Sequence, residues 1–182
     1  MKTFAKTFIL LFLIGVTFSS CEKIKSLADV KFDSELSGDI NVTVPAEGLK
    51  SASVAGVGFS GDATINPRSD SEIDKYFDKL KSFDVTGAQG TFKNVSKAVK
   101  IMSGTISVKS GSTTASWPIA DYEVANGKSI TLDNANGQWD KVNKILDSKN
   151  TFTVSIEGEA SEGGVSFTLT ILIKVKVTAN PL

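Results

Sequence analysis

The clearest pattern in the chain is an alternation of apolar and polar residues over segment 165–177. One face of this segment is entirely apolar and consists of Val165, Phe167, Leu169, Ile171, Ile173, Val175 and Val177. The other face is polar, with Leu172 as the exception. A period of two predicts an antiparallel strand with one buried face. Because thirteen residues extend over about 40 Å, we expect a bend or bulge that shifts this strand between two sheets.

Shorter alternating segments precede this one and are separated by turn residues. They lie at 30–44, split by Ser37-Gly38-Asp39, then at 59–65, 83–92, 100–108, 113–119, 128–132 and 152–156. Pro118 cannot donate to a ladder, so its strand either ends there or lies at a sheet edge. About eight strands at roughly ten-residue spacing predict an all-β fold, an antiparallel β-sandwich of the immunoglobulin-like kind. We expect a single domain over 30–182.

Two short helices interrupt the strands. In the first, Ser69 is the expected N-cap with Glu72 three residues later, and Ile73, Tyr76, Phe77 and Leu80 share one face. The second is expected over 138–147, with Trp139, Val142 and Leu146 on its apolar side. Asp70, Asp74 and Asp78 lie elsewhere on the first helix, where a solvated face is favoured over a cation site.

The N-terminus has the pattern of an export signal. Lys2 and Lys6 precede an apolar run at 8–16, and small residues follow it. The run is about half as long as the roughly 20 residues of a membrane-spanning helix, so a transmembrane anchor or a buried helix is the less favoured alternative. We therefore expect a signal peptide over 1–20, followed by a tether over 21–29 that begins at Cys21, the single cysteine.

The four residues Phe18-Ser19-Ser20-Cys21 resemble the lipobox of bacterial lipoproteins, with Phe18 where that motif usually has Leu. The resemblance implies that Cys21 receives a diacylglyceryl group, that the signal is cut before it, and that the new amine is acylated. The plain alternative is a signal ending at Ser20, with Cys21 a free thiol.

The lysine-rich segment 71–85 and the closing 152–158 hairpin resemble those of small Bacteroidetes lipoproteins. That resemblance implies a lipid-anchored protein of the outer membrane. Cys21 is followed by Glu22-Lys23-Ile24-Lys25 rather than by an acidic run, which favours the periplasmic face over the cell surface.

The amino-acid composition limits the partners and the reactions that this protein can have. Lys2 and Lys6 leave with the signal, so 18 basic residues remain against 20 acidic ones, a balance that argues against a nucleic-acid partner. The chain has no histidine, which excludes Ser-His-Asp and Cys-His catalysis and His-ligated metal. One cysteine also excludes a Cys-based metal site. We expect no cofactor and no enzyme activity, and any remaining chemistry would rest on carboxylates alone.

Three sets of residues deserve comparison as candidate sites. Glu157, Glu159 and Glu162 suit a glycosidase or calcium site, but a charged hairpin end is favoured. Segment 133–137 faintly resembles a calcium loop, although a turn with Asn136 as a helix cap fits better. Trp117 and Tyr122 are the candidate ligand-binding residues, with Trp117 beside Pro118 expected at the surface and Trp139 expected in the core.

Three functions follow from these patterns. The favoured one is a non-enzymatic lipoprotein that binds or supports another protein of the cell envelope. The alternative is a carrier or binder of a lipid or glycan, since a sandwich can open between its sheets. A hydrolase that uses carboxylates alone is the least favoured. No feature of the pattern indicates an oligomeric state.

Overall fold

A computed structural model of the chain describes residues 28–46 and 56–182. Cys21, the expected signal and most of the expected tether lie outside the described residues. The eight strands are β1 (Val30–Val44), β2 (Val57–Ile65), β3 (Leu80–Lys93), β4 (Val99–Ser110), β5 (Thr113–Val124), β6 (Ser129–Thr131), β7 (Phe152–Ala160) and β8 (Val165–Ala179). The helices are α3 (Ser71–Lys75) and α4 (Gln138–Asp147), with 3-10 turns at Pro67–Ser69, Phe77–Lys79 and Ala135–Gly137.

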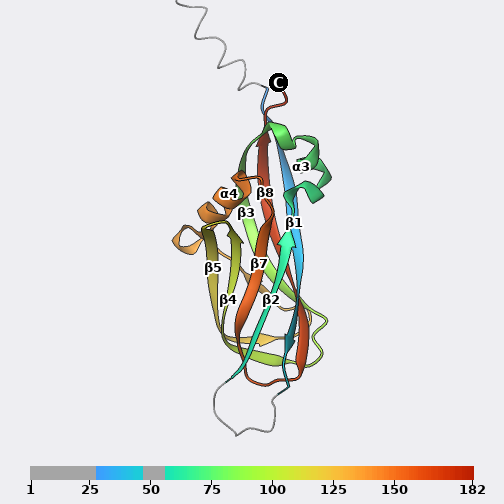
Figure 1. The fold of residues 1–182 in the computed structure, drawn as a ribbon, viewed down its shortest axis with the longest axis vertical. Helices are drawn as coiled ribbons and strands as arrows, with labels where there is room; N and C mark the ends of the chain where they lie inside the picture. Colours follow the sequence, from blue (N-terminus) through green and yellow to red (C-terminus); the bar gives the residue numbers. More distant parts are fainter. Residues whose placement is uncertain (1–27, 47–55) are drawn as a thin grey trace, which may run out of the picture.

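The strands form two four-stranded antiparallel sheets that pack face to face (Figure 1). Sheet A has the order β1-β8-β3-β6, and sheet B has the order β2-β7-β4-β5. The pairs β1–β8, β2–β7, β3–β6 and β4–β5 are nested, as if one long hairpin had been rolled up. The expected all-β antiparallel sandwich of eight strands is confirmed. Its strand order is that of a jelly roll, whereas an immunoglobulin domain groups its strands as ABED and CFG.

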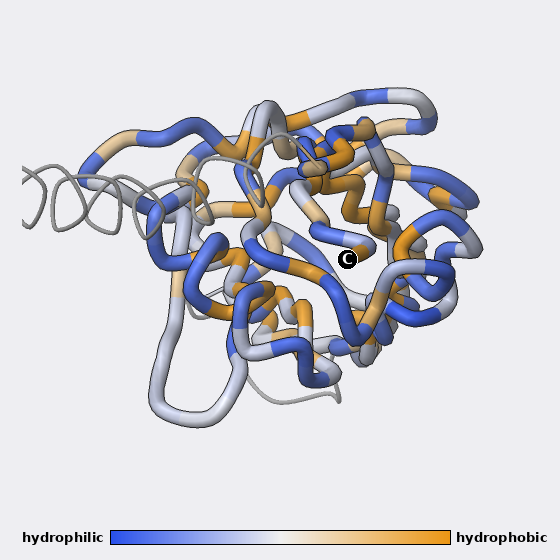
Figure 2. The backbone as a smooth tube through the Cα atoms, turned by 90° about the horizontal axis from the view of Figure 1, so that it is seen from above, coloured by the Kyte–Doolittle hydropathy of each residue, from blue (hydrophilic) through white to orange (hydrophobic). Residues whose placement is uncertain are grey.

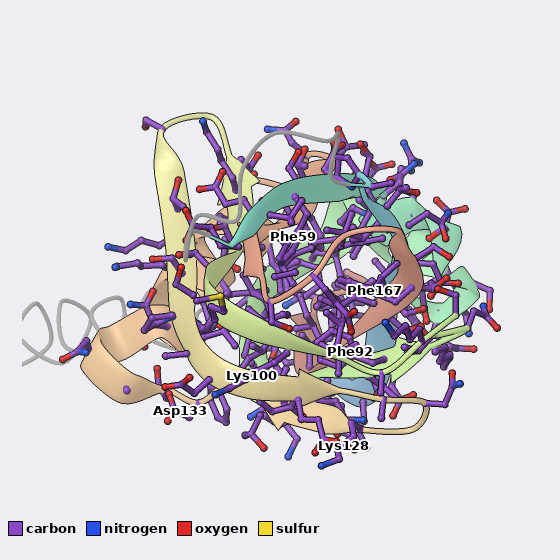
Figure 3. All side chains as sticks on the ribbon, turned by 90° about the horizontal axis from the view of Figure 1, so that it is seen from below. Phe59, Phe92, Lys100, Lys128, Asp133 and Phe167 are labelled. Carbon is purple, nitrogen blue, oxygen red and sulfur yellow. The ribbon has the colours of Figure 1, made fainter. Side chains whose placement is uncertain are left out.

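The interior is filled by the apolar faces of the two sheets. Phe167 of β8 lies between Phe59 of β2 and Phe92 of β3, with ring centroids 5.9 and 5.6 Å away and edge-on geometry. Figure 3 shows these three rings inside the sandwich, with Asp133 and Lys128 at its periphery. Figure 2 shows hydrophobic and hydrophilic stretches following one another along the backbone. The centre of the sandwich is therefore occupied by packed aromatic side chains.

Strand β1 is continuous, so the expected split at Ser37-Gly38-Asp39 is wrong. Gly38 serves close packing and not a turn: a Cβ there would stand 2.8 Å from Cγ1 of Ile65. Gly61 on β2 has the reciprocal role, because its Cβ would stand 2.9 Å from Cγ2 of Ile40. The two glycines let β1 and β2 approach each other where the sheets meet.

Strand β8 stays within sheet A, so the expected shift between sheets is also wrong. All fifteen of its residues pair with β1 in unbroken register. The irregularities lie on the other neighbour, β3, where the register shifts between Leu80 and Ser82 and between Val85 and Gly87. Extra residues in β3 take up the local twist. Strand β8 therefore keeps a continuous register with β1.

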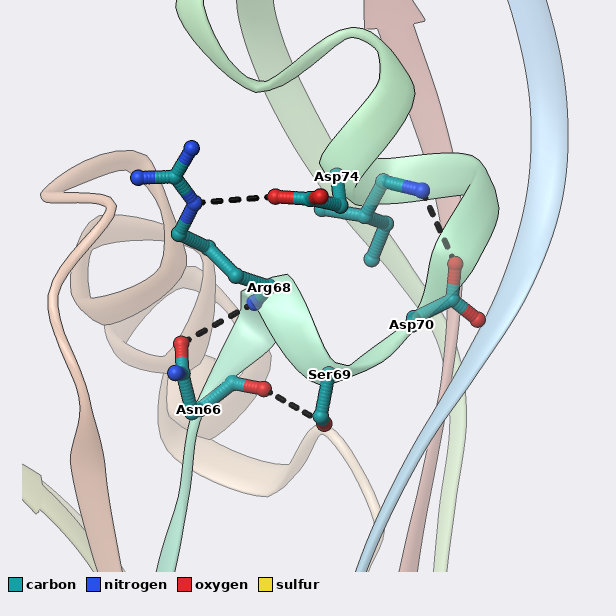
Figure 4. A network of polar contacts seen from close by, with 6 residues as sticks. Asn66, Arg68, Ser69, Asp70 and Asp74 are labelled. Carbon is teal, nitrogen blue, oxygen red and sulfur yellow. Dashed lines mark hydrogen bonds and ion pairs between the residues drawn. The ribbon is translucent and has the colours of Figure 1, made fainter.

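The first helix begins one residue later and ends earlier than expected. Asp70, not Ser69, is the N-cap: its Oδ1 accepts a hydrogen bond from the amide of Ile73 at 2.8 Å (Figure 4). The Ser69 hydroxyl instead donates to the carbonyl of Asn66 at 2.7 Å. Helix α3 ends at Lys75, and Leu80 already belongs to β3. Asp70 also accepts from the Ser34 hydroxyl at 2.7 Å. A carboxylate that caps the helix and bonds β1 fixes the start of the helix.

Strand β5 runs through Pro118 and is an edge strand of sheet B. Of the two sequence-based alternatives, an end at Pro118 or an edge position, the edge position is therefore confirmed. Amides point to the same side of a strand at every second residue. The amide of Ser116 faces away from β4 and bonds Gln138 at 2.9 Å, so the nitrogen of Pro118 faces the same open side. The missing N–H of proline therefore costs no ladder bond.

Helix α4 occupies the residues expected and closes one side of the sandwich. It packs between β3 of sheet A and β5 of sheet B (Figure 1). β6 covers β3 only at Gln89–Thr91, so two amides of the earlier part of β3 bond α4 instead. Asp147 accepts from Phe83 N at 3.0 Å, and Asn143 accepts from Val85 N at 2.8 Å. Four residues along a helix and two along a strand cover nearly the same distance, about 6 to 7 Å.

We expect Asn143→Ala to lower the free energy of unfolding by about 1 to 2 kcal/mol, because the amide of Val85 then loses its partner in a partly buried place. Urea denaturation followed by circular dichroism measures the change. Lys144→Ala on the exposed side of the same helix is the matched control, expected within about 0.5 kcal/mol of the wild type. Because alanine has the highest helix propensity, neither change can destabilise the helix through propensity. Equal stabilities of the two variants would show that the bond to β3 contributes nothing measurable.

Candidate functional site

Two surface hollows lie on the side of the sandwich next to α4, beside the loop that leads into this helix. Here β6 has only three residues, and the chain continues through segment 132–138 into α4. Both tryptophans hold this segment: Trp139 Nε1 donates to the carbonyl of Leu132 at 2.8 Å, and Trp117 Nε1 donates to that of Asp133 at 2.7 Å. The amide of Leu132 bonds Ala88 of β3 at 2.9 Å. Successive carbonyls of one loop are therefore fixed by two indoles from different elements.

The structure places the expected ligand-binding residues differently from the sequence reasoning. Trp117 is only 5% exposed, so the expected surface position is wrong. Its ring alternates into the core with Ala115 and Ile119, and the polar tip finds a backbone carbonyl. Tyr122 is partly buried, and its hydroxyl donates to Ser129 at 2.8 Å. The two residues therefore do not form an exposed stacking platform together.

Trp139 lines an accessible hollow, although the sequence favoured a core position for it. It is partly buried and packs against the hydrophobic core. It borders a crevice of about 230 Å³ on the outer face of sheet A, lined by Gly87, Ala88, Gln89, Thr131, Trp139, Leu172 and Lys174. We name this hollow the Trp139 crevice. Leu172, the one apolar residue on the outward face of β8, also lines it.

Polar groups surround the apolar part of the Trp139 crevice. Within the described part of the chain, the side chains of Gln89 and Thr131 take part in no hydrogen bond. The Lys174 ammonium lies 3.4 Å from a Glu35 carboxylate oxygen in an exposed pair. The indole N–H of Trp139 is already bonded, which fixes the orientation of the ring. The crevice thus offers a rigid aromatic wall and uncommitted donors and acceptors.

A second hollow lies on the other side of Thr131, between β5 and segment 133–138. It has a volume of about 290 Å³, with Trp117 and Pro118 on one side and Asp133, Asn136 and Gln138 on the other. The segment is a turn, as favoured over a calcium loop: Asp133 accepts from the amide of Ala135 at 3.1 Å. The expected cap is wrong, because Asn134, not Asn136, accepts from the amide of Trp139 at 2.8 Å. Asn136 has a left-handed backbone with φ 57°.

The glutamate cluster is divided by the fold. Glu157 and Glu159 project from β7 on the outer face of sheet B, whereas Glu162 lies in the β7–β8 loop and pairs with Lys97. Two broad, shallow hollows of about 570 and 530 Å³ lie on that face and share Glu157. Neither encloses the two carboxylates in a cleft, and both are open to solvent. The arrangement lacks the enclosed pair of carboxylates that glycoside hydrolysis needs.

The acidic residues near α3 have structural partners. Asp70 caps the helix, and Asp74 accepts from Nε of Arg68 at 2.9 Å (Figure 4). The Arg68 guanidinium also lies 4.3 Å from the centre of the Phe77 ring. Over residues 28–46 and 56–182, no group of three or more acidic, histidine or cysteine side chains is placed to hold a metal ion. No helix within those same ranges is long and apolar enough to cross a membrane.

Comparisons with known proteins add little to this description. No protein-family model matches the chain. No curated protein matches it either. Among solved structures, a chain from Desmodium yellow mottle tymovirus is similar at 11% identity and a TM-score of 0.29, over 84% of this chain and 90% of that one. A similarity of this size supports no inference about function.

Proposed function

We propose that this protein is a lipid-anchored bacterial envelope protein without catalytic activity, whose β-sandwich serves as a binding module. The observation that carries the proposal is the position of Cys21, the single cysteine, directly after an apolar run and two serines. Two or more acyl chains at this residue would hold the protein stably, whereas one chain alone holds only marginally. The outer membrane, at its periplasmic face, is the proposed location.

The start of the domain suits a short tether. Asp29 accepts hydrogen bonds from Lys81 at 2.6 Å and from Asn180 at 3.0 Å, so the first described residues are tied to β3 and to the C-terminal end. The bond from Lys81 holds the pKa of the Asp29 carboxyl below its ordinary value of 3.8. From Cys21 to Val30 the chain reaches at most about 30 Å. An anchored domain would therefore stay close to the membrane surface.

The alternative role is a carrier or binder of a lipid or glycan, with the ligand either enclosed between the sheets or held at the surface. The second arrangement is the one supported. The centre of the sandwich holds the packed rings of Phe59, Phe92 and Phe167, which leaves an acyl chain no place in the middle of the core. The Trp139 crevice and the hollow beside Trp117 are both on the outside of the sandwich. A ligand held at the surface is therefore favoured over one enclosed between the sheets.

The anchor is tested by changing Cys21 to Ala in the native host. We expect the wild type in the membrane fraction, with an intact mass that matches signal removal and acylation, and the variant released and unacylated. Ser19→Ala keeps a small residue in the same motif and is expected to behave like the wild type. A Cys21→Ala protein that remains in the membrane fraction would contradict the proposal and would point to the apolar run as the anchor.

A further inference from the structure

We infer that the Trp139 crevice is a binding site for a single saccharide ring, neutral or acidic, stacked on the indole face of Trp139. The inference deepens the proposed binding role, on which it rests, by naming the site and the class of ligand. It requires no acyl anchor, so the Cys21→Ala experiment and the experiment below can fail independently.

The first argument is the form of the wall. The face of an indole ring carries negative partial charge, whereas the C–H groups on one side of a pyranose carry positive partial charge. Trp139 is held in place by the bond from its Nε1 to Leu132, and the helix that carries it is bonded to β3 through Asn143. A wall that is already ordered loses little conformational freedom on binding.

The second argument is the set of groups around the wall. Gln89 brings an amide and Thr131 a hydroxyl to the crevice. Lys174 lines it with its aliphatic stem beside Gly87, while its ammonium pairs with Glu35 of β1 nearby. Neighbouring hydroxyls of a sugar both donate and accept, which suits this mixture of donors and acceptors. Gln89 and Thr131 have no hydrogen-bond partner among the described residues, so binding would break no existing bond of theirs. The positive charge of Lys174 disfavours a cationic ligand stacked on the indole ring of Trp139.

The third argument is size. The crevice has a volume of about 230 Å³, which is below the range of pockets that enclose drug-sized molecules. Gly87 forms part of its lining, and a Cβ at this position would meet only Lys174, at 3.9 Å. Space beyond that glycine is therefore open, and a side chain added there would project into the crevice. One ring fits such a site, with the rest of a glycan outside it.

The test uses this glycine and a matched glycine on the opposite sheet. Gly87→Val places a branched side chain in the lining of the crevice, and the nearest atoms to its Cβ are at ordinary contact distance. Gly58→Val is the control: this position lies on β2 in sheet B, and a Cβ there meets nothing within 4 Å. Both variants are expected to melt close to the wild type, which thermal denaturation checks before binding is measured.

The measurement is saturation-transfer NMR on the full chain as its host processes it, in the presence of micelles of a detergent without a sugar head group. The probes are the methyl glycosides of glucose, galactose, mannose and N-acetylglucosamine, together with glucuronic and galacturonic acids. At least one probe is expected to bind the wild type and Gly58→Val with a dissociation constant on the order of 1 mM, the range open to a ligand of about a dozen heavy atoms. Gly87→Val is expected to bind it at least tenfold more weakly.

Three outcomes would overturn the inference. Absence of binding by all six probes would remove the saccharide as the ligand. Equal binding by the wild type and Gly87→Val would place the sugar site elsewhere. A seventh probe, N-acetyl-leucinamide, tests the remaining occupant. Its binding to the wild type, lost in Gly87→Val while no sugar binds, would identify the crevice as a contact for an apolar side chain of a protein.

Discussion

Gly158→Ala is expected to destabilise the protein more than any other single methyl group added to its strands. A Cβ at this position would stand 2.3 Å from the carbonyl oxygen of Ser103 and 2.7 Å from Cα of Gly104. These atoms belong to the backbone of β4, in direct register with β7, and cannot move aside as a flexible side chain would. We expect a loss of about 3 kcal/mol or more in the free energy of unfolding, at the upper end of overpacking effects.

Gly58→Ala provides the comparison on the neighbouring strand. Its Cβ would meet nothing within 4 Å, and alanine is favoured over glycine inside a strand by roughly 0.5 to 1 kcal/mol. In urea denaturation, the midpoint of Gly158→Ala should therefore be lower than that of the wild type, and the midpoint of Gly58→Ala should be higher. If Gly158→Ala unfolds like the wild type, β4 and β7 must lie further apart at this point than the structure places them.

Phe92→Ala is the second change with a large expected effect. Phe92 is fully buried and its ring contacts those of Phe167 and Tyr122, each with centroids 5.6 Å apart. Truncation removes one ring and leaves a cavity that neighbouring aromatic rings cannot fill without leaving their own contacts. A loss of about 3 to 5 kcal/mol is expected from phenylalanine truncations of this kind, measured by urea denaturation.

Phe77→Ala is the control for this truncation. Phe77 lies outside the sandwich beside α3, where it is partly buried and covered by the guanidinium of Arg68 at 4.3 Å. Its truncation should cost less than half as much, since solvent reaches the space that it leaves. Similar losses from both truncations would mean that the aromatic cluster between the sheets contributes no more to stability than this surface contact.

Much of the fold follows from the spacing of apolar residues. The alternation in β7 and β8 and the periodicity of α4 predicted each element, because burial on one face enforces those periods. The errors arose where a residue type has two uses. Gly38 is a frequent turn residue, but here it serves close packing against Ile65. Ser69 and Asp70 are both good caps, and only the contact of Asp70 with Ser34 in β1 decides between them.

The candidate site was harder to predict from the sequence because it depends on how elements meet. The sequence favoured the surface for Trp117, beside Pro118, and the core for Trp139, but Trp117 is buried and Trp139 only partly so. The exposure of Trp139 results from the shortness of β6, which leaves β3 uncovered beside α4. One signal was present: Leu172 is the single apolar residue on a polar strand face, and it lines the Trp139 crevice. No site was predicted from this exception to a strict alternation, although the exception marks one of the residues of the crevice.

The nested pairing of the strands has a consequence for the order in which the chain can fold. β8 lies between β1 and β3, and β1 has no other partner within sheet A. Strand β1 must therefore wait until residues 165–179 have been made, and exported if the chain crosses a membrane, before it can pair. Contacts that join the two ends of a chain make folding slow and leave strand edges exposed meanwhile. For this protein, a chaperone that shields β1 and β3 during that interval would favour folding over aggregation.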